Sequence, residues 1–187
     1  MKKNLITSVK LTIVMITILG GLYPLLIAGV AKFAPGNGKG ETLSVNGKVV
    51  GYANIGQKFT DDKYFWSRPS AVDYNAAGSG GSNKGPSNPD YLKLVQDRID
   101  TFLVHNRGIK KEEIPSDMVT ASGSGLDPDI SVQGAQVQVK RIASVRHLDE
   151  KKIYNLIEQK TEHPLAGIFG PSKINVLKLN IALDNIK

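Results

Sequence analysis

Residues 11–31 read LTIVMITILGGLYPLLIAGVA, a run without one charged side chain that is flanked by Lys10 and Lys32. At about 1.5 Å of rise per residue, an α-helix of this length spans roughly 30 Å, the thickness of the hydrocarbon core of a bilayer. A helix also satisfies its own backbone polar groups in lipid. The run therefore predicts one transmembrane helix, and no later stretch predicts a second.

A cleaved secretory signal is the competing interpretation of this N-terminus, because Lys2 and Lys3 precede the apolar run and small residues close it at 29–31. The apolar region of a signal peptide is typically about 7–15 residues long, so a retained anchor is favoured. Lysines flank the helix in nearly equal number on its two sides. The short N-terminal tail favours a cytoplasmic N-terminus, which would make residues 32–187 extracytoplasmic.

The sequence divides into four parts. We expect a cytoplasmic tail at 1–10, the transmembrane helix at 11–31, a glycine-rich linker at 32–41 and one folded domain at 42–187. A domain of this length can bury a sizeable core. The chain has no cysteine, which rules out disulfides, thiolate catalysis and cysteine-ligated metals.

The charge pattern argues against a nucleic-acid partner. The net charge is +7, but the first 31 residues hold no acidic side chain, so the basic excess of the domain is smaller. Nucleic-acid binders concentrate Lys and Arg on one face, whereas here Lys110 and Lys111 are followed at once by Glu112 and Glu113. A mild basic excess suits solubility or a position near anionic membrane lipid.

Hydrophobic periodicity predicts an α+β domain. Strand-forming residues at Val49–Phe59 predict one or two short strands, and a Gly-, Ser-, Asn- and Pro-rich loop follows from Ser67 to Asn88. Such a long loop is either functional or fixed by its own hydrogen bonds. Asn88 then suits the N-cap of a helix that we expect to close near Gly108.

Two further helices and a strand complete this prediction. Helical spacing extends over Ser131–Arg146 and over Asp149–Lys160, where Ile153, Leu156 and Ile157 share one face. Alternating apolar residues then predict a half-buried strand over Ile174–Leu183.

No catalytic constellation is present. Ser122-Gly123-Ser124-Gly125 lacks the first glycine of a nucleophile elbow. His105, His147 and His163 have no metal-like spacing, so we expect structural or surface roles for them and no metal site. Ser79-Gly80-Gly81-Ser82 could form an anion-binding nest, although a tight loop whose Ser side chains bind their own backbone is the favoured interpretation.

Several strings in a fixed order identify a family. They cover nearly the whole chain behind the apolar helix and are GYANIGQKF at 51–59, YFWSRPSA at 64–71, Tyr74-Asn75, SGGSN at 79–83, VTASGSGLDP at 119–128, Gln138–Ala143 and NVLKLNIALD at 175–184. Together they resemble the C subunits of the Kdp potassium-transporting P-type ATPases, the KdpC family. One departure lies at Lys140, where the family usually has proline; without proline we expect a softer helix break or none there, and therefore a different geometry for Gln138.

The resemblance implies a non-catalytic accessory subunit of an inner-membrane pump that imports K⁺ with ATP. Its partners would be an ATP-hydrolysing subunit, a channel-like K⁺-binding subunit and membrane lipid. The family is described as a catalytic chaperone that raises the ATP affinity of the ATP-hydrolysing subunit. No cofactor would bind the chain tightly, and ATP would act through the complex. The resemblance offers as ATP-related candidates Gln138, Ser79, Gly80, Gly81 and Ser82.

Topology leaves two mechanisms open. If the domain is extracytoplasmic, the bilayer separates it from ATP, so any effect on ATP affinity is allosteric. Alternatively, the domain braces the channel-like subunit or shapes the access of K⁺. A free-standing, membrane-tethered binding protein or hydrolase is the alternative of a different class.

Two sets of residues are candidates for contacts with other subunits. One face of the transmembrane helix carries the small residues Thr17, Gly20, Pro24 and Ala28 at spacings of three and four. In the domain, the candidates for either a subunit interface or the anchoring of loops are Tyr64, Phe65, Arg68 and Asn75.

Overall fold

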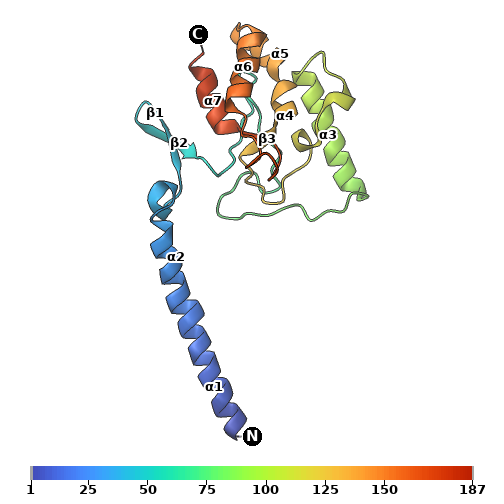
Figure 1. Ribbon diagram of the computed structural model, residues 1–187. Coiled ribbons are helices and arrows are strands. Elements are labelled where there is room, and N and C mark those ends of the chain that lie inside the picture. Colours follow the sequence, from blue (N-terminus) through green and yellow to red (C-terminus); the bar gives the residue numbers. More distant parts are fainter. Residues whose placement is uncertain (1, 187) are drawn as a thin grey trace. The chain divides into compact units, whose positions relative to one another are not determined.

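The computed structural model describes residues 2–186 of the chain (Figure 1). It divides into two compact units, with residues up to Thr42 in the first and residues from Leu43 onward in the second. The predicted α+β class is confirmed by an apolar N-terminal helix followed by a domain of helices and short strands. The two units are described separately below.

The N-terminal unit is one long helix in three parts. α1 (Lys2–Ile16) and α2 (Tyr23–Ala31) are α-helical, and a π-helical turn, Thr17–Leu22, joins them. In this turn the Tyr23 N–H donates to the carbonyl of Ile18. The helix is long and apolar enough to cross a membrane, and it also includes residues 2–10, which precede the uncharged run.

A short 3₁₀ turn, Pro35–Gly38, follows the apolar helix within the expected linker. Two strands come next, β1 (Thr42–Val45) and β2 (Lys48–Tyr52), which form a hairpin. Asn46 and Gly47 join them with φ values of 51° and 77°, the positive values that a two-residue hairpin turn requires. Of the one or two short strands predicted over Val49–Phe59, the structure has one, β2, which ends at Tyr52.

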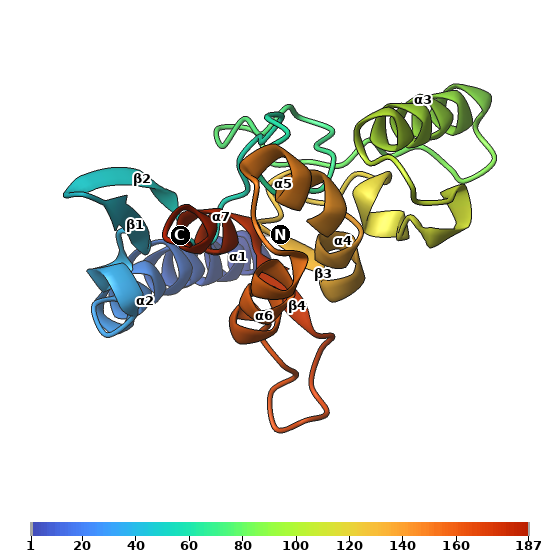
Figure 2. The same cartoon turned by 90° about the horizontal axis from the view of Figure 1, so that it is seen from above.

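Four helices surround a second pair of strands (Figure 2). β3 (Asp129–Ser131) pairs antiparallel with β4 (Lys173–Asn175), and Ile130 lies opposite Ile174. The surrounding helices are α4 (Val132–Gln136), α5 (Val139–Arg146), α6 (Glu150–Lys160) and α7 (Val176–Asp184). Their inner faces form the core with α3 (Pro89–His105), and its largest fully buried apolar side chains are Phe65, Ile130, Ile142, Ile153, Ile157, Ile174, Leu179 and Leu183.

Two predicted helices are confirmed, one of them with its predicted N-cap, Asn88, and the other with a cap that the structure adds. Asn88 accepts a hydrogen bond from the Tyr91 N–H at 3.0 Å and begins α3, and Asp149 accepts from the Lys151 N–H at 2.9 Å and begins α6. Such side-chain acceptors satisfy donors that the first turn leaves without a helical partner. The end of α3 lies earlier than expected, because Asn106 is its C-cap and Gly108 follows with a φ of 90°.

The predicted strand over Ile174–Leu183 is wrong beyond Asn175. The Asn175 side chain accepts a hydrogen bond from the Lys178 N–H at 3.0 Å and starts helix α7. Leu177, Leu179 and Leu183 do alternate in sequence, but they are buried together with Val176 and Asn180 on a broad helical face. α7 packs against both α6 and β4, so it buries residues two positions apart as well as those three or four positions apart. The alternation of apolar residues therefore did not distinguish this helix from a strand.

The predicted helix over Ser131–Arg146 is interrupted at Val137 and Gln138, which separate α4 from α5. The Gln138 N–H donates to Ala135, and the Gln138 side chain donates to the carbonyl of Gly134 at 2.8 Å, which a continuous helix would bond through the backbone. Lys140 is the second residue of α5, where an N–H has no partner within the helix. The break therefore forms without proline at this position.

Replacing Lys140 by proline should be tolerated for the same reason. We expect Lys140→Pro to change the free energy of unfolding by less than about 1 kcal/mol. Ser144→Pro, at an exposed site inside α5, should lower it by about 3 kcal/mol or more. Urea unfolding of the full chain in mild detergent, followed by fluorescence of its single tryptophan, measures both. Equal losses in the two variants would mean that α4 and α5 are one helix.

Candidate functional site

The centre of the domain is an irregular segment, Asp61–Ser67, which forms neither helix nor strand although Phe65 within it is fully buried. Buried backbone polar groups need partners. Three buried side chains supply them: Gln138 from the break before α5, Arg141 from α5 and Asn180 from α7. We call these three side chains the clamp.

Gln138 is fully buried, and both ends of its amide are bonded. Its Oε1 accepts from the Trp66 N–H and from the Arg141 guanidinium, each at 2.7 Å. Its Nε2 donates to the carbonyl of Gly134 at 2.8 Å and lies 3.4 Å from the carbonyl of Trp66. The side chain therefore holds the Trp66 backbone against the break between α4 and α5, and the folded domain offers no part of it to a ligand.

Arg141 brings a cation into the same interior. Its guanidinium donates to the carbonyls of Asp62 and Tyr64 and, at 2.9 Å, to Oδ1 of Asn106. It also lies 4.7 Å from the centre of the Trp66 ring, a cation–π distance. Burial lowers the pKa of Arg141 to about 10, opposed by the nearby carboxylate of Asp62. The group remains charged at neutral pH and depends on these acceptors for its solvation.

Asn180 completes the clamp from α7. Its Oδ1 accepts from the Phe65 N–H at 2.9 Å, and its Nδ2 donates to the Phe65 carbonyl at 3.0 Å. The neighbouring Tyr64 is half-buried and donates its hydroxyl to Asp184 at 3.0 Å. Burial is the main cause that raises the pKa of Tyr64. Of the two interface or anchor candidates within this segment, Phe65 is thus a core residue and Tyr64 anchors the segment to α7.

His105 closes the other side of the segment. Its Nδ1 lies 2.8 Å from Oδ1 of Asp62, and its ring centre lies 4.8 Å from that of Trp66. His105 is itself exposed, as are His147 and His163, but its contacts give it a structural role.

Internal hydrogen bonds also hold the long loop after the segment. Arg68 forms a 2.8 Å ion pair with Asp127, and the hydroxyl of Tyr74 donates to the carbonyl of Arg68. Burial raises the pKa of Tyr74 to about 12. Asn75 is exposed, and its side chain accepts from the Ala77 N–H at 3.0 Å. Arg68 thus anchors the loop to the domain, whereas the hydrogen bond of Asn75 forms a local turn, and a contact of Asn75 with another subunit stays a prediction.

The two glycine- and serine-rich strings lie side by side. The Gly80 N–H donates to the carbonyl of Ser124 at 2.8 Å, and the Ser79 hydroxyl donates to the same carbonyl at 3.0 Å. A Cβ at Gly81 would lie 3.2 Å from the carbonyl oxygen of Gly123, so the close approach favours glycine. Ser82 is exposed. Gln138 forms no hydrogen bond with residues 79–82. Its hydrogen bonds therefore do not join the ATP-related candidates into one site.

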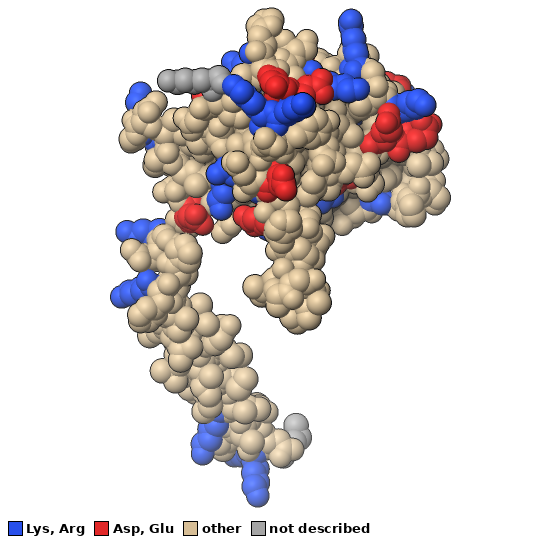
Figure 3. Space-filling model, turned by 45° about the horizontal axis from the view of Figure 1, so that its top comes forward, with Lys and Arg blue, Asp and Glu red and all other residues tan. Residues whose placement is uncertain are grey.

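A cavity of ≈ 370 Å³ lies between the loop and α3, and its lining includes Trp66, Tyr74, Arg98 and Phe102. The Lys58 ammonium near it is paired with Asp73 at 2.8 Å. Within residues 2–186, no three His, Asp or Glu side chains are grouped closely enough to hold a metal ion. Figure 3 shows charges of both signs intermixed on the face it presents, without a continuous basic patch.

Sequence reasoning singled out Gln138 but missed the other two members of the clamp. Arg141 follows Gln138 by three residues and interrupts an otherwise apolar helical face, and Asn180 interrupts an apolar run. A polar residue at a position that periodicity assigns to the core was the available signal, because such a residue needs a buried partner.

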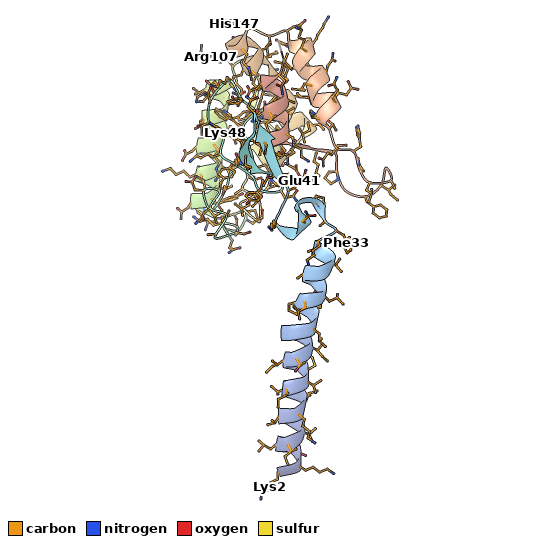
Figure 4. The ribbon with its side chains drawn as sticks, turned by 90° about the vertical axis from the view of Figure 1, so that its left-hand side faces the viewer. Lys2, Phe33, Glu41, Lys48, Arg107 and His147 are labelled. Atoms are coloured by element: carbon orange, nitrogen blue, oxygen red, sulfur yellow. The ribbon has the colours of Figure 1, made fainter. Side chains whose placement is uncertain are left out.

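In the apolar helix, the side chains project to all sides between Lys2 and Phe33 (Figure 4). Thr17, Gly20, Pro24 and Ala28 are exposed there, and the Thr17 hydroxyl donates to the carbonyl of Ile13. The π-helical turn that begins at Thr17 changes the angular spacing of the residues after it. A shared interface for these four residues stays a prediction.

Comparison with known proteins gives a consistent result. The profile of the family described as "KdpC: K+-transporting ATPase, c chain" matches residues 5–185. The Potassium-transporting ATPase KdpC subunit of Flavobacterium psychrophilum is 62% identical over 185 residues, covering 99% of this chain and all of the relative. The proteins of the same name from Bacteroides fragilis and Bacillus mycoides are 50% and 42% identical, each over 99% of this chain and 98% of the relative.

The clamp predicts a large and specific loss of stability. Gln138→Leu would leave the Trp66 N–H and the Gly134 carbonyl without their partner, so we expect the free energy of unfolding to fall by about 3 kcal/mol. Gln136→Leu makes the same chemical change at an exposed site two residues away and should change it by less than about 0.5 kcal/mol. Urea titration of the full chain in detergent measures both variants. Similar losses would show that Gln138 does not hold the segment.

Proposed function

The chain belongs to the KdpC family, the C chains of K⁺-transporting ATPases, and we propose that it serves such a pump as a non-catalytic accessory subunit. In this role it is anchored by its single apolar helix and stabilises the complex through its domain. Its partners are the ATP-hydrolysing subunit and the channel-like subunit that binds K⁺. The complex lies in the cell inner membrane.

The observation that supports the accessory role is that the buried polar side chains of the domain bind its own backbone. Gln138, Arg141 and Asn180 all bind the backbone of the 61–67 segment. These groups fix a long irregular stretch of chain, so they support a rigid binding module. A catalytic site would instead need a nucleophile or a general base that faces a substrate.

We propose that the domain is extracytoplasmic and contacts the outer face of the channel-like subunit, where it braces that subunit or shapes the access of K⁺. Lysines occur in nearly equal number on the two sides of the helix, so charge does not decide the orientation and the labelling experiment below tests it directly. The loop surface, which carries Asn75 and Ser82, is exposed, and the bonds of Ser79 and Gly80 to the Ser124 carbonyl fix the loop beneath it, as a docking surface requires.

An effect on ATP affinity would then be indirect. A bilayer core of roughly 30 Å would separate the domain from nucleotide on the cytoplasmic side. Gln138 would act through the shape of the domain, since it has no exposed surface. The chaperone role is measurable as the ATP concentration for half-maximal hydrolysis, which should rise when the complex lacks this chain. An unchanged value would remove the chaperone role and leave the bracing role.

Co-purification from native membranes tests the subunit role. A full chain tagged at its C-terminus and extracted in mild detergent should recover a P-type ATPase and a channel-like polytopic protein in a fixed ratio by mass spectrometry. Recovery of the folded chain alone would favour the free-standing tethered binding protein or hydrolase.

Thiol labelling tests the orientation, and the cysteine-free chain gives no background. Ser82→Cys should react with an impermeant maleimide on intact spheroplasts, because Ser82 is exposed. Ser122→Cys is the matched control, since Ser122 is only 6% exposed and should react only after denaturation. Ser8→Cys, in the N-terminal tail, should react only after the membrane is opened. The reverse order for Ser82 and Ser8 would invert the topology.

A further inference from the structure

The chain between α6 and β4 forms a second hairpin, residues 162–173, which projects from the domain (Figure 2). At its base, Glu162 and Lys173 exchange two backbone hydrogen bonds of 2.8 and 3.1 Å. Near its tip, Leu165 and Phe169 exchange two more, of 3.1 and 3.0 Å. We call this element the 162–173 hairpin. Its backbone pairing gives it a defined shape.

Its tip presents large apolar side chains to solvent. Leu165, Ile168 and Phe169 are 77%, 77% and 65% exposed. No charged side chain occurs in 164–172, where the sequence is PLAGIFGPS. Figure 3 shows a projecting lobe with neither blue nor red atoms. An apolar cluster of this kind, set apart from the core, indicates a surface that something else covers.

The turn at the tip adds a second observation. Ala166 and Gly167 have φ values of 54° and 77°, and the Ile168 N–H donates to the Leu165 carbonyl at 3.3 Å. Positive φ is uncommon for alanine, whose Cβ makes this conformation strained. The domain gains no core packing in return, since the flanking side chains are exposed. Backbone strain of this kind is typical of functional positions.

The base of the hairpin lies where the chain enters the domain. A cavity of ≈ 450 Å³ is lined by Leu43 and Ser44 of β1 together with Thr161 and Glu162. The first residues of the domain and the base of the hairpin therefore share one side of it. The linker, residues 32–41, can span at most about 35 Å when fully extended. This side of the domain is thus held within that distance of the end of the apolar helix.

We propose that the apolar tip of the 162–173 hairpin inserts into the lipid of the membrane that holds the chain, at the boundary between headgroups and acyl chains. Leu, Ile and Phe are the side chains that bind this boundary through burial of apolar area. The hairpin carries no cluster of lysines, and its Lys173 is paired with Asp129 at 2.6 Å. Insertion therefore depends on apolar contact and should depend little on salt or on anionic lipid.

This inference rests on the membrane anchor, one part of the proposed function, and not on the partner subunits. It gives the domain a second attachment to the membrane, which would limit its rotation about the linker. A pocket on another protein could also cover an apolar tip. The absence of charge and the short tether to the membrane helix favour lipid, and the experiment below separates the two.

Fluorescence quenching by brominated lipid tests insertion. Phe169→Trp places a tryptophan at the tip of the full chain, which is reconstituted in phosphatidylcholine vesicles with or without brominated acyl chains. The unaltered chain, with only Trp66, gives the baseline. We expect brominated lipid to remove about half or more of the added fluorescence, since an interfacial segment reaches about 5–10 Å into this boundary. The quenching should be the same at low and high salt.

Two controls make the result specific. Val104→Trp places the same probe on α3 at a site that is 66% exposed, and it should not be quenched. Ile168→Asp in the Phe169→Trp chain should abolish the quenching, and because Ile168 is exposed this change leaves the core intact.

Each other outcome overturns the inference. A chain that fails to float with vesicles after an alkaline wash has no membrane anchor, and the insertion of the hairpin fails with it. A Phe169→Trp chain that floats but whose added tryptophan stays unquenched has an anchor without an inserted hairpin. Protection of this tryptophan from aqueous iodide only when the other subunits are present, without quenching by lipid, would assign the tip to a protein pocket.

Discussion

The buried guanidinium of Arg141 is the constraint on which the rest of the domain depends. A cation in a protein interior is tolerated only when its donors are satisfied, and Arg141 finds acceptors on Asp62, Tyr64, Asn106 and Gln138. These acceptors come from a helix end, a helix break and an irregular segment. One side chain therefore fixes three parts of the chain relative to one another.

The clamp explains how a domain with little sheet can hold a long irregular stretch. The 61–67 segment is bonded to α5 and α7, and the loop after it is fixed by pairs such as Arg68 with Asp127. The polar and glycine-rich strings form the surface of the loop and stay ordered, because internal hydrogen bonds hold their backbone. A rigid module of this design suits the proposed role of an accessory subunit that positions other proteins.

Particular elements show how far sequence reasoning reached. The apolar helix, α3 and α6 were predicted because each carries its own signal. These signals are an uncharged run in the first, the capping side chain of Asn88 in the second and one apolar face in the third. α7 was predicted as a strand because its alternating leucines fit the two-residue period of a strand as well as a broad helical face. Gln138 was selected by family resemblance, and its amide proved to be buried among Trp66, Gly134 and Arg141.

The sequence by itself determined the apolar helix, the family, the α+β class and the absence of cysteine chemistry. These follow from composition and local order, which do not depend on distant contacts. Tertiary structure decided that Gln138, Arg141 and Asn180 meet at one segment, and that the apolar residues of the 162–173 hairpin stay outside the core. Both depend on which side chains come together across distant parts of the chain, and periodicity describes only the face of a single element.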